Sequence, residues 1–307
     1  MTIRPFTQID VFTEQPYLGN PLAVVLDSDG LSDETMQAFA RWTQLSETTF
    51  VLPVSAAARA QGADYRVRIF TPGGELPFAG HPTLGTAHAW REAGGQPQQP
   101  DQIVQECAVG LVRLRPGPDK TWAFAAPTLQ RQDPTPDELN RICQALRLDR
   151  SRLLRAQHLH NGPHWLGLLL DSPETVLALD PDHAALKHIG IKVGVAAPYA
   201  LAPALIARAN REARAFAPAR PVTAPDADLE VRAFVAAIGI AEDPVTGSLN
   251  ACLAQWLMAE GVMPTHYTAS QGAALGRSGR VQLSQDASGQ VWVGGHTVTC
   301  ITGQVHL

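Results

Sequence analysis

The sequence carries acidic and histidine side chains suited to proton transfer, and it lacks the common signatures of several other enzyme chemistries. Glu47, His81 and Asp243 lead this set, with Glu75 and Glu242 as further carboxylates. The chain has no G-x-S-x-G nucleophile elbow, no G-x-G-x-x-G dinucleotide fingerprint and no G-x-x-x-x-G-K-[ST] phosphate loop. Such a set suits removal and return of a proton at a carbon next to a carboxylate or carbonyl, without an obvious cofactor.

Glu47 stands in a polar segment, residues 44–49, before an apolar strand expected at residues 50–52. From position alone, its carboxylate is either a solvated loop residue or an ionisable group at the rim of a core. Partial burial raises the pKa of a carboxyl toward neutrality, where a general base works best. The other carboxylates have a simpler interpretation, because Glu75, Glu242 and Asp243 precede expected helices and could cap them.

A repeated turn pattern marks the elements that must position these groups. FTPGGELPFAGHPTLGT at residues 70–86 returns in part as EDPVTGS at residues 242–248, at a constant offset of 167 positions (242 minus 75). Each copy predicts a tight turn that feeds an apolar helix, at residues 83–92 and 249–260, and each helix is expected to end at a glycine, Gly94 or Gly261. The offset relates Glu75 to Glu242, Pro77 to Pro244, Gly80 to Gly247 and His81 to Ser248.

Helix N-termini of this kind are candidate anion sites, because their first N–H groups have no partner within the helix and lie at the positive end of its dipole. They could hold a substrate carboxylate or a developing enolate. A pair of them predicts a duplicated, two-domain protein with a cleft. The simpler alternative is a chance match in a chain with 25 Gly and 24 Pro.

Length and composition favour a two-domain chain that acts on a small molecule. The 307 residues exceed the usual limit for one core, and 45% hydrophobic residues are enough for two. A net charge of −5 and a pI near 6.0 provide no basic field for nucleic acid or a lipid headgroup surface. No secretory apolar region and no window of ~18 apolar residues is present, so we expect a cytoplasmic protein with no membrane partner.

Two groups of metal-binding residue types have ordinary interpretations. The cysteines are widely scattered and without C-x-x-C spacing, so we expect reduced core thiols at Cys107, Cys143, Cys252 and Cys300. His158, His160 and His164 could converge on a metal, but no acidic partner lies nearby in the sequence and an NGP turn explains the segment. We therefore expect no metal site.

Alternating and helical periodicities outline the remaining elements. Strands are expected on either side of PYLGNP within residues 3–26, and a helix over residues 31–45. Residues 127–136 are the best linker candidate, and a helix follows to residue 148. Further strands are expected at residues 65–70, 102–108, 110–114, 121–125, 193–197, 229–234, 280–284, 290–293 and 298–305. The segment Ala200–Asp228 shows no clear pattern.

Several long motifs carry a family resemblance: QIDVFTEQPYLGNPLAVVLD, SETTFVLP, RIFTPGGELPFAGHPTLGTA, GIAEDPVTGSLNACLAQWL and, near the end, QGAALGRSGRV. Together they resemble the PhzF-like phenazine-biosynthesis isomerases of the diaminopimelate-epimerase-like superfamily, over nearly the whole chain. The resemblance implies an α+β fold of two pseudo-symmetric domains, each a β-barrel-like sheet around a central helix, with the active site between them. The expected domains are residues 1–127 plus 297–307, and residues 128–296.

The resemblance also implies roles for individual residues. Glu47 matches the general acid/base that moves a proton between carbons of a cyclic, anionic substrate without a metal or organic cofactor. His81 and Asp243 match the groups that assist and orient. The implied substrate-binding positions are Gly80, Gly247 and Ser248, and the implied assembly is a homodimer.

The chain departs from the superfamily's racemase branch, which uses a pair of cysteines as opposed acid and base. Ala79 and Pro244 stand near the motif helix starts, which disfavours a two-thiol racemase. We expect a cofactor-independent isomerase of a small anionic carboxylate, with the substrate and pathway undefined. The alternatives are a lyase that eliminates water or ammonia after the same proton abstraction, and a non-catalytic binding or scaffold protein. The segment Ala200–Asp228 departs from the compact family spacing.

Overall fold

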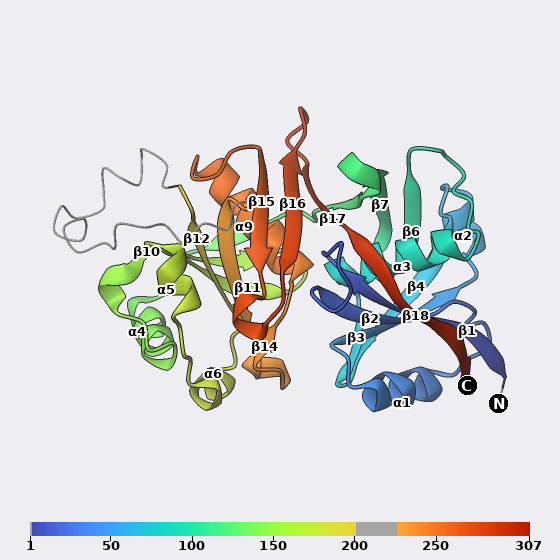
Figure 1. The fold of residues 1–307 in the computed structure, drawn as a ribbon, viewed down its shortest axis with the longest axis horizontal. Coiled ribbons are helices and arrows are strands. Elements are labelled where there is room, and N and C mark those ends of the chain that lie inside the picture. Colours follow the sequence, from blue (N-terminus) through green and yellow to red (C-terminus); the bar gives the residue numbers. More distant parts are fainter. Residues whose placement is uncertain (1, 201–225) are drawn as a thin grey trace. The chain divides into compact units, whose positions relative to one another are not determined.

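The computed structural model describes residues 2–200 and 226–307, and its chain divides into two compact units. Unit 1 comprises Met1–Ala125 with Val293–Leu307, and unit 2 comprises Ala126–Trp292. Both are mixed α/β and largely sheet (Figure 1). Most of the segment Ala200–Asp228 that showed no sequence pattern, residues 201–225, lies outside the described residues.

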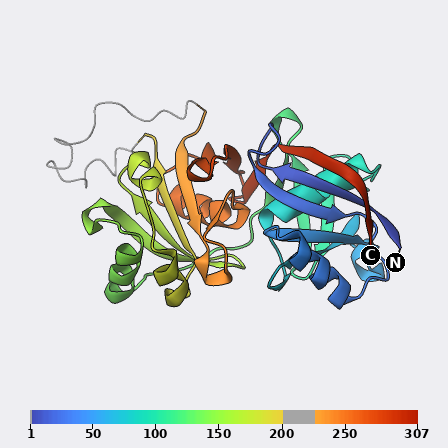
Figure 2. The same cartoon turned by 60° about the horizontal axis from the view of Figure 1, so that its bottom comes forward.

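Unit 1 is built on a continuous series of paired strands. β1 lies between β18 and β2 and is antiparallel to both, and Figure 2 shows β18 running beside β1. β2 pairs in parallel with β3, and β3 antiparallel with β4. β4 then pairs antiparallel with β5 and in parallel with β6, which continues antiparallel through β7 to β8. The strands are β1 (Ile3–Val11), β2 (Asn20–Val25), β3 (Glu47–Leu52), β4 (Tyr65–Thr71), β5 (Gly74–Leu76), β6 (Ile103–Cys107), β7 (Gly110–Pro116), β8 (Trp122–Ala125) and β18 (Thr297–His306).

One buried helix and one amphipathic helix cover this sheet. α3 contacts β1, β2, β3, β6, β8 and β18, and a Cβ at its Gly85 would come within 2.6 Å of Leu22 Cδ2, so glycine permits the close approach to β2. α1 packs over an aromatic cluster that includes Phe39, Phe50 and Phe70. The helices are α1 (Asp33–Thr43), α2 (Ala56–Arg59), α3 (Gly80–Glu92) and the 3-10 turn η1 (Pro118–Lys120).

Unit 2 has its own series of paired strands. β9, β10 and β11 are antiparallel neighbours, β11 pairs in parallel with β12, and β12 antiparallel with β13. β13 then pairs antiparallel with β14 and in parallel with β15, which continues antiparallel to β16. The strands are β9 (Gln130–Gln132), β10 (Leu153–His160), β11 (His164–Leu170), β12 (Val193–Pro198), β13 (Leu229–Phe234), β14 (Glu242–Asp243), β15 (His266–Gln271), β16 (Gly279–Gln285) and β17 (Val291–Gly295), at which the chain returns to unit 1.

The helices of unit 2 differ sharply in burial. α9 is buried along most of its length, including Cys252 and Trp256. α4, α5 and α6 instead cover an aliphatic cluster with Leu166, Leu168 and Val195. The helical segments are α4 (Pro136–Ala145), α5 (Pro173–Leu177), α6 (His183–Ile189), α9 (Gly247–Ala259), η2 (Arg150–Arg152), η3 (Ala236–Ile238) and η4 (Ala273–Leu275). No helix in residues 2–200 and 226–307 is long and apolar enough to span a membrane.

The motif helices end as predicted and begin earlier. Gly94 and Gly261 follow them with φ of +92° and +65°, the left-handed conformation that glycine adopts most easily. The starts expected at residues 83 and 249 were wrong, because α3 begins at Gly80 and α9 at Gly247. Pro82 obscured the first start, although proline is tolerated in the first turn of a helix.

Two further expectations need correction. β9 lies within the expected linker at residues 127–136, because its residues pair with the end of β10. The four cysteines are free thiols as expected, but only three are buried, and Cys300 on β18 is partly exposed.

Candidate active site

Glu47 is the first residue of β3, and the interpretation as a solvated loop residue is wrong. It pairs with Leu22 in the parallel register of β2 and β3. Thr48 and Thr49 follow it and are fully buried, with Thr49 accepting a hydrogen bond from Thr86 Oγ1 on α3 at 2.9 Å. The Glu47 side chain is 16% exposed. The strand therefore presents a carboxylate at the edge of a buried polar layer.

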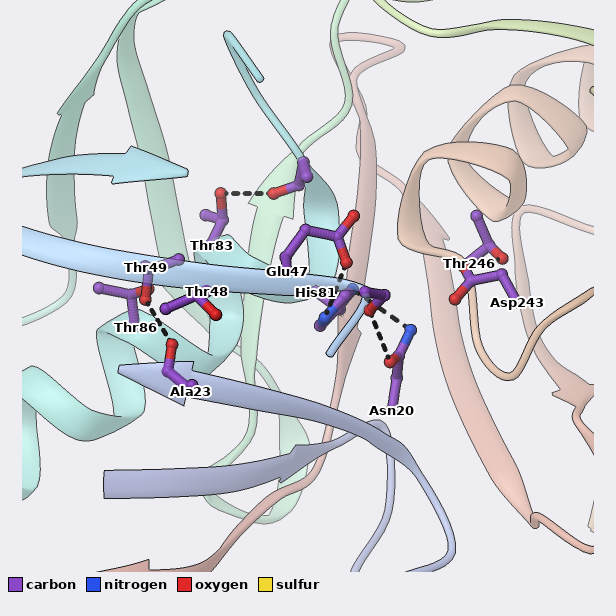
Figure 3. Close-up of polar contacts among 12 residues, drawn as sticks. Asn20, Ala23, Glu47, Thr48, Thr49, His81, Thr83, Thr86, Asp243 and Thr246 are labelled. Atoms are coloured by element: carbon purple, nitrogen blue, oxygen red, sulfur yellow. Dashed lines mark hydrogen bonds and ion pairs between the residues drawn. The ribbon is translucent and has the colours of Figure 1, made fainter. Parts of the chain in front are cut away.

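His81 is the second residue of α3 and faces Glu47. Its Nε2 lies 3.6 Å from Glu47 Oε2, and its side chain is only 5% exposed (Figure 3). The start of α3 places the imidazole here, so the turn motif and β3 bring two of the expected residues together. A carboxylate and an imidazole at this separation can exchange or share a proton through small side-chain movements.

Asn20, which sequence reasoning missed, contacts the opposite side of the imidazole. Its Nδ2 lies 3.4 Å from His81 Nδ1, and its Oδ1 accepts a hydrogen bond from Ser46 Oγ at 3.4 Å. With the amide nitrogen as donor, His81 Nδ1 is the acceptor, and the proton of a neutral imidazole resides on Nε2, which faces Glu47. The Asn20 contact therefore favours the His81 tautomer that carries its proton on Nε2.

The turn that delivers Asn20 is itself tightly held. Gly19 N donates to the buried carboxylate of Asp10 at 2.9 Å, and a Cβ at Gly19 would lie 2.3 Å from Val11 O. The only sequence signal was LGNP before an apolar strand, which indicated a turn and nothing more.

The start of α3 is braced by a buried side-chain series. Tyr65 OH donates to Gln105 Oε1 at 3.1 Å, Gln105 Nε2 donates to Thr83 Oγ1 at 3.2 Å, and Thr83 Oγ1 donates to Ala79 O at 2.9 Å. Ala79 is the N-cap residue, and it makes no side-chain cap hydrogen bond. The first turn, including Gly80, therefore retains the polarity of an anion site.

Asp243 and the remaining expected residues belong to unit 2. Asp243 ends β14, and its Oδ2 accepts a hydrogen bond from Thr246 Oγ1 at 2.5 Å (Figure 3). Gly247 and Ser248 are the first two residues of α9. Ser248 Oγ accepts from Trp165 Nε1 at 3.3 Å, so a tryptophan of β11 orients this hydroxyl.

The carboxylates expected as helix caps have other partners. Arg68 binds both oxygens of Glu75 at 2.8 and 2.6 Å, and Arg232 binds both oxygens of Glu242 at 2.9 and 2.8 Å. For Glu75 and Glu242 the capping interpretation was wrong, because each arginine lies on the strand that precedes its motif, and a guanidinium matches a carboxylate with two parallel bonds.

The histidine group of β10 and β11 forms a hydrogen-bonded series. His158 Nε2 lies 2.8 Å from Glu138 Oε2 on α4, and His164 Nε2 lies 3.1 Å from His158 Nδ1. An acidic partner absent from the local sequence is thus supplied by a distant helix. Partial burial, together with the neighbouring His158, lowers the pKa of His164. No group of three His, Cys, Asp or Glu side chains suited to a metal ion occurs in residues 2–200 and 226–307.

Comparison with known proteins gives a consistent picture over the full length. Residues 9–303 match the family model described as phenazine biosynthesis-like protein (PhzC-PhzF). The chain is 34% identical to antisense-enhancing sequence 1 of Schizosaccharomyces pombe, over 99% of both chains. It is 33% identical to trans-2,3-dihydro-3-hydroxyanthranilate isomerase of Pseudomonas aeruginosa, over 98% of this chain and 99% of the relative. A PhzF-family crystal structure from Bacillus anthracis covers both chains fully, with a TM-score of 0.80 and 22% identity.

Proposed function

Because the chain belongs to the phenazine biosynthesis-like (PhzF) family and is an isomerase of that family, we propose that it moves a proton between carbons of a small anionic carboxylate. Glu47 is the general acid/base. One observation carries this proposal: the mostly buried Glu47 carboxylate lies 3.6 Å from the buried imidazole of His81, whose Nδ1 contacts Asn20. No organic cofactor or metal is invoked, because a carboxylate can take a proton from one carbon and return it to another.

The two side chains have distinct tasks in this mechanism. Glu47, as the carboxylate, removes a proton from the carbon next to an electron-withdrawing group and holds it as the carboxylic acid. The carboxylic acid exchanges this proton with solvent and then delivers a proton to a second carbon, which regenerates the carboxylate. His81 presents Nε2–H to the reacting region, where it can donate a hydrogen bond to charge that develops on the substrate.

The remaining expected residues, in both units, are proposed to assist the same reaction. Asp243 is the orienting carboxylate, and Gly80, Gly247 and Ser248 bind the anionic substrate. Support comes from the helix starts, since neither Ala79 nor Thr246 makes a side-chain cap hydrogen bond. Backbone N–H groups left in this way favour a carboxylate ligand.

We also propose that the two units are pseudo-symmetric versions of one fold, each wrapped around its motif helix. The support is the order of strand pairing. β1 to β7 follow the same series of parallel and antiparallel neighbours as β10 to β16. α3 follows β5, and α9 follows β14.

The relative from Pseudomonas aeruginosa supplies a first compound for the assay. Its name states that it isomerises trans-2,3-dihydro-3-hydroxyanthranilate, which is a small anionic carboxylate. The purified chain is incubated with this compound in D₂O, and the product is analysed by mass and NMR. We expect a product of unchanged composition that carries deuterium at the carbon protonated in the reaction.

The mass of the product separates the proposal from its nearest alternative. Loss of water or ammonia would identify a lyase that starts with the same proton abstraction. A failure of both conversion and exchange, for this compound and for a panel of related cyclic carboxylates, would contradict the isomerase proposal.

A non-catalytic role is the second candidate. One observation favours it: the relative from Schizosaccharomyces pombe, at 34% identity, carries a name that describes no enzymatic reaction. A protein of this kind would bind cyclic carboxylates in a thermal-shift assay without catalysing exchange of their carbon-bound hydrogen.

A further inference from the structure

Gln271, the last residue of β15, makes four hydrogen bonds around the second turn motif and is fully buried. Its Oε1 accepts from Thr246 N at 3.0 Å and from Asn250 Nδ2 at 2.8 Å. Its Nε2 donates to Asp243 O at 3.1 Å and to Thr246 Oγ1 at 3.0 Å. One amide group therefore contacts both ends of the turn that carries Asp243.

The orientation of this amide is fixed by backbone groups. Thr246 N can only donate a hydrogen bond, and Asp243 O can only accept one. Oε1 must therefore face Thr246 N, and Nε2 must face Asp243 O. A rotated amide would place two donors against each other and two acceptors against each other, which is costly for buried groups.

The fixed amide sets the direction of the next hydrogen bond. Because Nε2 donates to Thr246 Oγ1, that oxygen acts as an acceptor toward Gln271, and its own hydrogen points to Asp243 Oδ2 at 2.5 Å. Asp243 Oδ2 is consequently an acceptor. Hydrogen bonds of this polarity favour the ionised form of a carboxyl group and hold it in one position.

We propose that Gln271 is a positioning residue for Asp243, which it holds as an oriented hydrogen-bond acceptor through the Thr246 hydroxyl. This inference rests on the proposed function for the role that Asp243 plays in the reaction. It assigns a use to the Q-G-x-x-x-G-R segment at residues 271–277, which the proton-transfer residues do not explain. Gln271 itself touches no reacting atom.

The test uses four variants of the full-length chain: Gln271→Met, Thr246→Val, their combination, and Thr246→Ser. The first removes all four hydrogen bonds of the amide, and the second removes only the hydroxyl that connects it to Asp243. Thr246→Ser keeps the hydroxyl and should therefore retain the activity that Thr246→Val loses. Gln255→Met is the matched control, because it makes the same change at Gln255 on α9, whose side chain donates to Pro127 O at 3.0 Å.

Steady-state rates with trans-2,3-dihydro-3-hydroxyanthranilate give the first readout. Loss of one hydrogen bond to a charged group predicts a kcat lower by about 10- to 100-fold in each single variant, with KM changed by less than about threefold. Because both changes remove one connection, the double variant should fall little below the lower single variant. Thr246→Ser and Gln255→Met should stay near wild type. Losses that multiply in the double variant would overturn the proposal.

Crystal structures of the same variants give a readout that does not depend on turnover. We expect the Asp243 carboxylate to leave its position in Gln271→Met and Thr246→Val while α9 remains in place. An unmoved carboxylate in both variants would overturn the inference. If wild type neither converts nor exchanges this compound and the panel of related cyclic carboxylates, the proposed function fails, and the crystal structures still decide whether Gln271 positions Asp243.

Discussion

The two motif turns share a backbone pattern and differ in how their functional side chain is held. In unit 1 the turn presents His81, which Asn20 contacts from the strand β2. In unit 2 the turn presents Asp243, which Thr246 contacts from within the same turn and Gln271 braces from β15. His81 and Asp243 thus occupy different positions of the repeat, since the offset relates His81 to Ser248, and each turn is contacted by a neighbouring amide side chain.

The two turns also differ in the environment of the glutamate that begins each of them, Glu75 or Glu242, although the spacing within the turns is the same. Glu75 pairs with Arg68 at a partly exposed site, where the two side chains are 36% and 17% exposed. Glu242 pairs with Arg232 at a buried site, and Arg232 also donates to carbonyl oxygens at the end of α5, including those of Val176 and Leu179. We conclude that the second turn is anchored to its core, and the first is anchored at its surface.

The largest expected effect distinguishes these two anchors. Arg232→Met leaves Glu242 as a buried carboxylate without its partner, which should lower the free energy of unfolding by about 3–5 kcal/mol. Arg68→Met should cost about 1 kcal/mol or less, because solvent screens an exposed pair. Urea unfolding followed by circular dichroism measures both. Equal losses would show that the anchors do not differ.

The next effect tests the amide that fixes His81. Asn20→Asp replaces the donor with an acceptor, so His81 Nδ1 should carry a proton. Nε2 of the neutral imidazole should then no longer be the protonated nitrogen. We expect an isomerisation rate lower by about 10- to 100-fold, which is the range for loss of one general acid–base or orienting contribution. ¹⁵N NMR of the His81 ring reports the proton position directly. Asn140→Asp on the exposed face of α4 is the control, and an unchanged ring spectrum in Asn20→Asp would refute the assignment.

The smallest effect compares the interiors of the two motif helices. The repeat offset places Gln255 of α9 at the position of His88 in α3 (88 plus 167). Burial lowers the pKa of His88, although the nearby carboxylate of Glu92 acts in the opposite direction. A histidine with a lowered folded pKa contributes stability above its ordinary value near 6.5, and this contribution is lost as the pH falls through the folded value.

His88→Gln should therefore flatten the decrease in melting temperature as the pH falls from about 7 to 5. The test compares the melting temperatures of wild type and variant at each pH in this range. Because both proteins share the other titrating groups, the contributions of those groups cancel in the difference. A decrease equally steep in the variant would show that His88 does not contribute to it.

Local signals in the sequence were sufficient for the ends of the motif helices and for most strands. Gly94 and Gly261 marked the helix ends because a left-handed residue after a helix favours glycine whatever its tertiary surroundings. Glu47 and His81 could be selected by chemistry and family resemblance, and the structure brings them together.

The partners of these residues could not be predicted, because they depend on pairing between distant strands. In the sequence, Asn20 could be interpreted only as part of a turn, and Gln271 only as part of a glycine-rich motif. Thr48 and Thr49 made the start of β3 resemble a polar loop, yet they are buried because hydroxyls on α1 and α3 satisfy them. Amide and hydroxyl side chains carry no periodic signal that reveals their bonding partner.

The most direct test of the central claim is deuterium exchange from solvent into trans-2,3-dihydro-3-hydroxyanthranilate, measured for wild type, Glu47→Gln and Asp243→Asn. Glu34→Gln, on the exposed face of α1, is the control for loss of a carboxylate. The account predicts that Glu47→Gln lowers the exchange rate by about 10³-fold or more, and that Asp243→Asn lowers it less. Exchange by Glu47→Gln at the wild-type rate would contradict the assignment of Glu47 as the group that moves the proton.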